Sequence, residues 1–212
     1  MLKKRKNKIK FRKYFKDLTK ESFDILYLIL TSLINNYKNN NIYKIPLENR
    51  NLYLTKIFEN IKIHYKIIIN KNIPYLGGYS LENKNLYVDK NFYKEINEYQ
   101  FKLIILHEYI ERTLLNNLLD FNYFLAHQIA QQIEYSFYTI EEENKLQKIV
   151  DDFEQITLKK FESSKIIIPL DLDETGYKDC GDLILLQKCK KFSFEKEKKT
   201  NKQNFVFKSK IG

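Results

Sequence analysis

The sequence predicts an α+β fold in which a small β-sheet or hairpin packs on a helical core that contains an antiparallel helix pair. Apolar residues recur at helical spacing in several long segments, as they do in amphipathic helices. Between residues 61 and 89, shorter stretches alternate apolar and polar side chains or lie between turn residues, as strands do. The 212 residues, of which 43% are hydrophobic, suffice for one packed core.

The first expected element is a core helix over residues 23–33. This apolar run follows a basic segment, as in a signal peptide, but acidic residues intrude and no small-residue cleavage site follows. The run is also too short to span a bilayer. We expect the helix to end before the asparagine-rich stretch that begins at Asn35.

Strands are expected next. Residues 61–67 alternate apolar with polar or semi-polar side chains, which predicts a half-buried strand in which His64 has a structural role. Residues 73–80 lead through a polar turn into 85–89, which predicts a β-hairpin. Within it, Gly77-Gly78 marks a bulge, a close approach to the backbone or an ordinary loop bend.

The following segments are expected to be helical. Residues 99–117 carry a wide apolar face, and Asp120 is a candidate N-cap for a second helix from residue 121 to about residue 140. The short connection requires the two helices to be antiparallel neighbours. Apolar residues at helical spacing over 146–156 predict a third helix, and a strand-like run follows at 183–186.

Charge divides the chain into a basic N-terminal arm at 1–16, a single α+β domain at 17–187 and a basic C-terminal tail at 188–212. The arm holds nine Lys and Arg and no acid, and the tail holds nine Lys and two Glu, so the domain between them is mildly acidic. Such ends either bind polyanions through salt-sensitive contacts, nucleic acid among them, or remain solvated tails. The candidate polyanion-binding residues are Lys3, Lys4, Arg5 and Lys6.

Several classes of function find no support in the sequence. Cys180 and Cys189 are too few for a disulfide framework or a four-thiolate zinc site, and they favour a reducing, cytoplasmic setting. Neither a Gly-rich phosphate loop nor a nucleophile-elbow serine motif occurs. Asp171 and Asp173 could cap a turn or bind a cation, but a solvated loop is the simpler expectation.

Two polar sites interrupt apolar helix faces about twenty residues apart. His107 and Glu111 are four residues apart, so they share one face of the first helix with its apolar residues. On the second helix His127 and Glu134 share a face beside small alanines. With a rise of about 1.5 Å per residue from the connecting turn, the two sets interleave if the helices are antiparallel. We therefore expect His107, Glu111 and His127 to converge, and two imidazoles with one carboxylate form the ligand set of many catalytic zinc sites.

The pattern resembles that of zincin-like metallopeptidases over roughly residues 60 to 140. That family carries His-Glu-x-x-His on a helix, and this chain carries His107-Glu108-x-x-Glu111, with Glu111 in place of the second histidine. The resemblance implies zinc as the cofactor and a peptide or protein as the substrate. It also implies that Glu108 is the base that deprotonates the attacking water.

In the same family a strand borders the substrate cleft before the motif, and a third ligand follows on a later helix. Residues 86–89 stand in the place of the strand, and His127 or Glu134 in the place of the later ligand. Arg112 could then steady Glu134, Glu108 or a substrate carboxylate. The pairing of Glu111-Arg112 with the second helix also resembles small phage or mobile-element proteins.

We therefore expect a zinc-dependent hydrolase, with Glu134 as a fourth ligand or as outer support for the ligands. The alternative is a nonenzymatic structural or nucleic-acid-associated protein, in which the same His and Glu residues form a metal-free hydrogen-bond network. Bound zinc in purified protein supports the first reading. Salt-dependent retention of DNA or RNA without metal supports the second.

Overall fold

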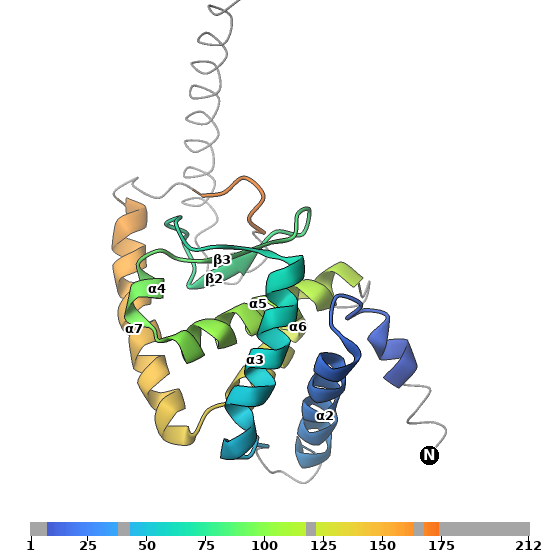
Figure 1. The fold of residues 1–212 in the computed structure, drawn as a ribbon. Coiled ribbons are helices and arrows are strands. Elements are labelled where there is room, and N and C mark those ends of the chain that lie inside the picture. Colours follow the sequence, from blue (N-terminus) through green and yellow to red (C-terminus); the bar gives the residue numbers. More distant parts are fainter. Residues whose placement is uncertain (1–7, 38–42, 118–121, 163–167, 174–212) are drawn as a thin grey trace, which may run out of the picture.

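Helices make up most of the chain, and one small mixed sheet lies against them (Figure 1). The computed structural model describes residues 8–37, 43–117, 122–162 and 168–173, with no side-chain detail for 153–162. The elements are α2 Lys20–Tyr37, α3 Leu47–His64, β1 Lys66–Ile68, β2 Gly77–Tyr79, β3 Asn85–Val88, α4 Phe92–Glu95, α5 Glu98–Asn117, α6 Tyr123–Ser136 and α7 Ile140–Glu162. This mainly helical α+β fold confirms the expected class.

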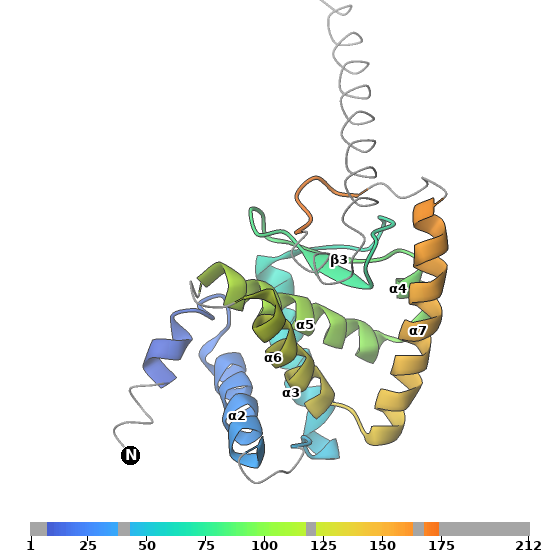
Figure 2. The same ribbon diagram turned by 180° about the vertical axis from the view of Figure 1, so that it is seen from behind.

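The helix α5 is the centre of the core. It lies under the sheet, and α3 and α6 pack along it, while α7 runs along one side of the molecule (Figures 1 and 2). All its residues from Leu103 to Leu114 are buried. Glu111 meets His127 near the connection and His107 meets Glu134 farther away, so α5 and α6 are antiparallel, as expected.

The sheet has the order β1-β3-β2, with β1 parallel and β2 antiparallel to β3. The register Gly77↔Val88 and Tyr79↔Leu86 confirms the expected hairpin. However, β3 is the central strand and β2 is an edge strand. Residues 86–89 were expected to border the cleft, but their strand is paired on both sides, and among the described strands β2 forms the edge on this side of the sheet.

The expected strand over 61–67 is wrong in its first four residues, which complete α3. Leu54, Ile57, Phe58 and Ile61 are buried at spacings of three and four, so α3 has a helical apolar stripe that continues into this segment. Ile63, which the alternation would bury, is 76% exposed. His64 is exposed at the helix end, and the strand β1 starts only at Lys66.

Three helix ends differ from expectation. The helix α2 continues to Tyr37, and within its last turn the Asn36 side chain donates to the Ser32 carbonyl at 2.9 Å. The cap of α6 is Asn122, which accepts from the Leu125 amide at 2.9 Å, while Asp120 lies outside the described residues. This helix ends at Ser136 rather than near 140, because Thr139 and Glu142 form a capping box that starts α7.

A return segment, residues 168–173, ties the chain after α7 to the hairpin. The Asp171 carboxylate accepts hydrogen bonds from Asn83, Asn85 and Tyr87 at 2.6 to 3.0 Å. The Asp173 amide donates to the Tyr79 carbonyl on β2 at 2.8 Å. Asp171 therefore anchors the hairpin, and the expectation of a solvated loop is wrong for this residue.

Within the described ranges, no helix combines the length and the apolar character needed to cross a bilayer. Lys3, Lys4, Arg5 and Lys6, the strand-like run at 183–186, and the basic tail at 188–212 lie outside those ranges.

Candidate metal centre

The two ligand-bearing helices approach closely where both are lined by small residues. Ala126 and Ala130 of α6 have no exposed surface and lie on the side that faces the core. Their short side chains let α6 lie near α5, as expected from the sequence. As a result His107 is only 8% exposed and Glu111 only 3%, although both are polar residues on a helix. Buried polar groups of this kind require partners.

Three side chains converge on one point, as expected. The His127 Nδ1 atom lies 2.8 Å from the Glu111 Oε2 atom. The His107 Nε2 atom lies 3.2 Å from His127 Nδ1 and 3.3 Å from Glu111 Oε2. A tetrahedral zinc ion with bonds of about 2.0 to 2.1 Å holds its ligand atoms about 3.3 Å apart. Two sides of the triangle match this spacing, while the side from His127 to Glu111 is a 2.8 Å hydrogen bond that would have to widen by about 0.5 Å around an ion. These two nitrogens and one carboxylate oxygen could therefore hold a metal ion.

Glu134 lies behind His107 and not among the converging atoms. Its Oε2 atom is 2.8 Å from the His107 Nδ1 atom, on the far side of the imidazole ring from the triangle. In a neutral imidazole, a proton on Nδ1 would donate to Glu134 and leave the Nε2 lone pair facing the common centre. Metal-ligating histidines almost always have such an outer carboxylate or carbonyl partner. Of the two roles expected for Glu134, the geometry favours outer support.

The buried charges of the cluster require a positive charge among them. Burial opposes the protonation of His107, but hydrogen bonds with Glu111 and Glu134 outweigh it and raise the pKa of His107 well above its usual value. Burial likewise opposes the ionisation of Glu111, yet hydrogen bonds to His107 and His127 lower its pKa to about 2. A proton on His107 satisfies this requirement in the metal-free protein, and a metal ion would satisfy it in the same place.

Glu108 points from α5 toward the edge strand. A Cβ atom built on Gly77 would lie 2.5 Å from its Oε1 atom, so the carboxyl group rests directly on the bare backbone of β2. Gly77 therefore marks a close approach and not an ordinary bend. Burial, with the negative charges of Glu111 and Glu134 adding to it, raises the pKa of Glu108 to about 8. A carboxyl group in this range can exchange a proton near neutral pH.

The register also determines where the backbone of β2 points. Hydrogen bonds from Ser80 to Asn85 and from Asp89 to Leu76 flank the Gly78↔Tyr87 pair, which is therefore the pair that bonds across the two strands. The N–H and C=O groups of Gly77 consequently point away from β3, toward the outer edge. The Tyr79 carbonyl points the same way and accepts from the return segment. Backbone groups that could pair with an extended peptide thus lie next to Glu108.

The hydrogen bonds of Arg112 go to the hairpin and to Tyr65, and not to Glu134 or Glu108. Its guanidinium donates to the carbonyls of Ser80, Leu81 and Asn83 in the hairpin turn, at 2.7 to 3.4 Å. It also donates to the Tyr65 hydroxyl at 3.2 Å. The side chain thus leaves α5 on the side of the turn, where it holds the hairpin on the helix.

Tyr79 belongs to the site but was not expected there. Its side chain lies on the same face of β2 as the missing side chain of Gly77, because residues two apart in a strand share a face. It is 3% exposed and lies near Glu111 and Glu108. The sequence offered a way to predict this position. Side chains alternate along a strand, so Tyr79 has to share a face with Gly77, which was already a candidate for a close approach.

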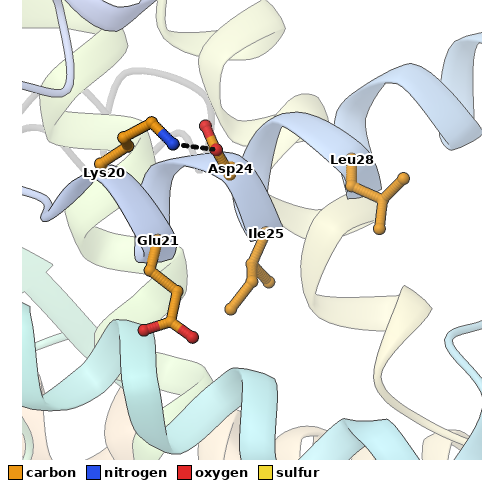
Figure 3. Close-up of a pocket in the computed structure, with 5 residues that line it drawn as sticks. All are labelled: Lys20, Glu21, Asp24, Ile25 and Leu28. Atoms are coloured by element: carbon orange, nitrogen blue, oxygen red, sulfur yellow. Dashed lines mark ion pairs between the residues drawn. The ribbon is translucent and has the colours of Figure 1, made fainter.

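A surface hollow lies away from this cluster. It is lined by residues of α2 alone, namely Lys20, Glu21, Asp24, Ile25 and Leu28 (Figure 3). Lys20 and Asp24, four residues apart on the helix surface, form an ion pair at 3.7 Å. The hollow offers no converging donor atoms comparable to those between α5 and α6.

The chain matches no family model, no curated protein and no solved structure.

Proposed function

We propose that the protein is a zinc-dependent hydrolase that acts on peptides, and that it works in the cytoplasm. The observation that carries the proposal is the convergence of His107 Nε2, His127 Nδ1 and Glu111 Oε2 within 3.3 Å of one another. The Glu134 carboxylate supports it by turning the His107 lone pair toward the same centre.

The residues around the centre suit hydrolysis. A zinc ion bound there would supply Lewis acidity and lower the pKa of a water molecule to about 7. Glu108 would accept the proton of the attacking water at its carboxylate and pass it to the leaving amine. The outer edge of β2 would align an extended peptide beside Glu108, because the peptide groups of Gly77 point there.

Zinc binding tests the proposal directly. Protein purified without a histidine tag should contain about one zinc per chain, because three donor atoms and one open position form a single site. Elemental analysis and equilibrium dialysis give the stoichiometry. His64→Ala is the matched control, since His64 is exposed at the end of α3 and its loss should leave the zinc content unchanged. Protein that stays metal-free at micromolar zinc would contradict the proposal.

The substitution Gly77→Ala tests whether turnover depends on the position of the Glu108 side chain. Gly77→Ala puts a Cβ atom 2.5 Å from the Glu108 carboxyl oxygen, so this side chain has to move. We expect turnover to fall by about tenfold to a hundredfold, because small misplacements of reacting groups are costly, while zinc content is retained. Peptide hydrolysis and zinc content are the measurements.

Gly78→Ala is the control for this variant. Its Cβ atom would meet the Leu172 side chain at 2.7 Å and not Glu108. Both substitutions should lower the free energy of unfolding, by about 1 to 3 kcal/mol. Only Gly77→Ala should lower turnover; equal losses in both variants would show that crowding at the edge strand, and not Glu108, limits the reaction.

The competing function is a structural or nucleic-acid-associated protein. The metal-free cluster is already hydrogen-bonded through His107, Glu111, His127 and Glu134, so it can order the helix pair without an ion. Retention on heparin or nucleic acid that falls steeply with salt, in protein without zinc, would favour this function.

A further inference from the structure

The hydroxyl group of Tyr79 is buried and lacks a partner in the described part of the chain. Its side chain is 3% exposed and faces α5 from the edge strand. A buried hydroxyl without a hydrogen bond costs about 1 to 3 kcal/mol, and a phenylalanine would fill the same space without that cost. The hydroxyl therefore calls for an explanation other than packing.

The charged groups that act on this hydroxyl are Glu111 and Glu108 of the site and Asp173 of the return segment. Burial first, and the negative charges of Glu111, Asp173 and Glu108 in addition, raise the pKa of Tyr79, so the hydroxyl keeps its proton and remains a donor. It lies next to Glu111 but falls short of hydrogen-bond geometry with it. Among the described residues, the hydrogen bonds of Glu111 involve its Oε2 atom, on the side of the two histidines.

Metal binding would change what Glu111 can accept. In the metal-free protein the 2.8 Å contact between His127 Nδ1 and Glu111 Oε2 requires a proton on one of the two atoms. A metal ion would bind a lone pair of each of these two atoms, so they could no longer be hydrogen-bonded to each other. The Glu111 carboxylate would then lack a hydrogen bond from His127. Carboxylates that bind a metal are normally hydrogen-bonded to another group of the protein.

We propose that the Tyr79 hydroxyl donates a hydrogen bond to the free oxygen of Glu111 when the centre holds a metal ion, so that Glu111 binds through one oxygen only. Tyr79 is thus a positioning residue, and its role rests on the metal centre of the proposed function. Two positions on one face of β2 thus serve the site. Tyr79 would support Glu111, and Gly77 leaves room for the Glu108 side chain.

Tyr79→Phe tests this role without depending on activity. The affinity for zinc should fall by about 10 to 100 times, as it does when an outer partner of a ligand is removed. Competition with a chromophoric zinc chelator measures the affinity. The metal-free variant should be as heat-stable as wild type or more so, because the lost hydroxyl has no partner in that state.

Tyr109→Phe is the matched control. Tyr109 is 1% exposed, and its hydroxyl too lacks a partner in the described part of the chain, but it lies near Tyr65 and Asp17 on another side of α5. Its zinc affinity should equal that of wild type. If wild type binds zinc and both variants bind it equally well, the role of Tyr79 is refuted while the metal centre stands. If wild type binds no zinc, the metal centre and the role of Tyr79 fall together.

Discussion

We expect His107→Ala to lose zinc and peptide hydrolysis together. The substitution removes one of three donor atoms, and it also removes the imidazole that lies between the carboxylates of Glu111 and Glu134. Because two buried carboxylates lose that partner, the free energy of unfolding should fall by about 3 to 5 kcal/mol. Elemental analysis, peptide hydrolysis and urea unfolding are the measurements.

A second variant separates metal loss from unfolding. The His127 side chain is 37% exposed, so His127→Ala removes a donor atom at a smaller cost in stability. We expect it to remain folded and to lose zinc and turnover as His107→Ala does. A folded His127→Ala protein with wild-type zinc content would contradict the assigned ligand set.

Glu108→Gln should lower turnover by about 10² to 10⁴ while zinc content stays at about one per chain. Glutamine keeps the size of the side chain but cannot accept the proton of the attacking water. A digest of a peptide library identifies a substrate, and turnover of that substrate is then compared at equal zinc occupancy. Wild-type turnover in the variant would eliminate Glu108 as the base.

The stability of the Glu108→Gln variant shows whether its lower turnover reflects the loss of a base or partial unfolding. The raised pKa of Glu108 means that burial penalises its charged form, so the wild-type protein loses stability as the pH rises from the carboxyl's unfolded pKa of about 4.3 toward 8. Glutamine has no such penalty. The metal-free variant should therefore be at least as stable as wild type at pH 7. Loss of folding in both Glu108→Gln and His107→Ala would instead indicate a structural hydrogen-bond network.

The helix pair and the convergence of its three side chains could be predicted because they depend on local periodicity. Helical spacing places His107 and Glu111 on the buried face, and the rise per residue from a short turn places His127 opposite them. The helix boundaries were less accurate, because single side chains decide them: Thr139 with Glu142 starts α7, and Asn122 starts α6.

The cleft side of the site could not be predicted in the same way. Residues 86–89 are not at the edge of the sheet because β1 pairs with β3 in parallel. This pairing joins two strands that are separated in the sequence by β2, so local patterns do not reveal it. Alternation over 61–67 was too short to outweigh the helical stripe of α3. Three of the partners of Arg112 are backbone carbonyls, which any sequence would offer, so residue types alone could not identify them.

The return segment bears on the order in which this protein is assembled during synthesis. The helices α5 and α6 are neighbours in the chain, so the donor atoms can meet once residue 136 is made. Asp171 meets Asn83, Asn85 and Tyr87 across 84 to 88 residues, and closing so long a loop is slow and entropically costly. We therefore expect the nascent chain to acquire metal affinity first. The edge strand that would hold a peptide is fixed only after residue 173 has left the ribosome.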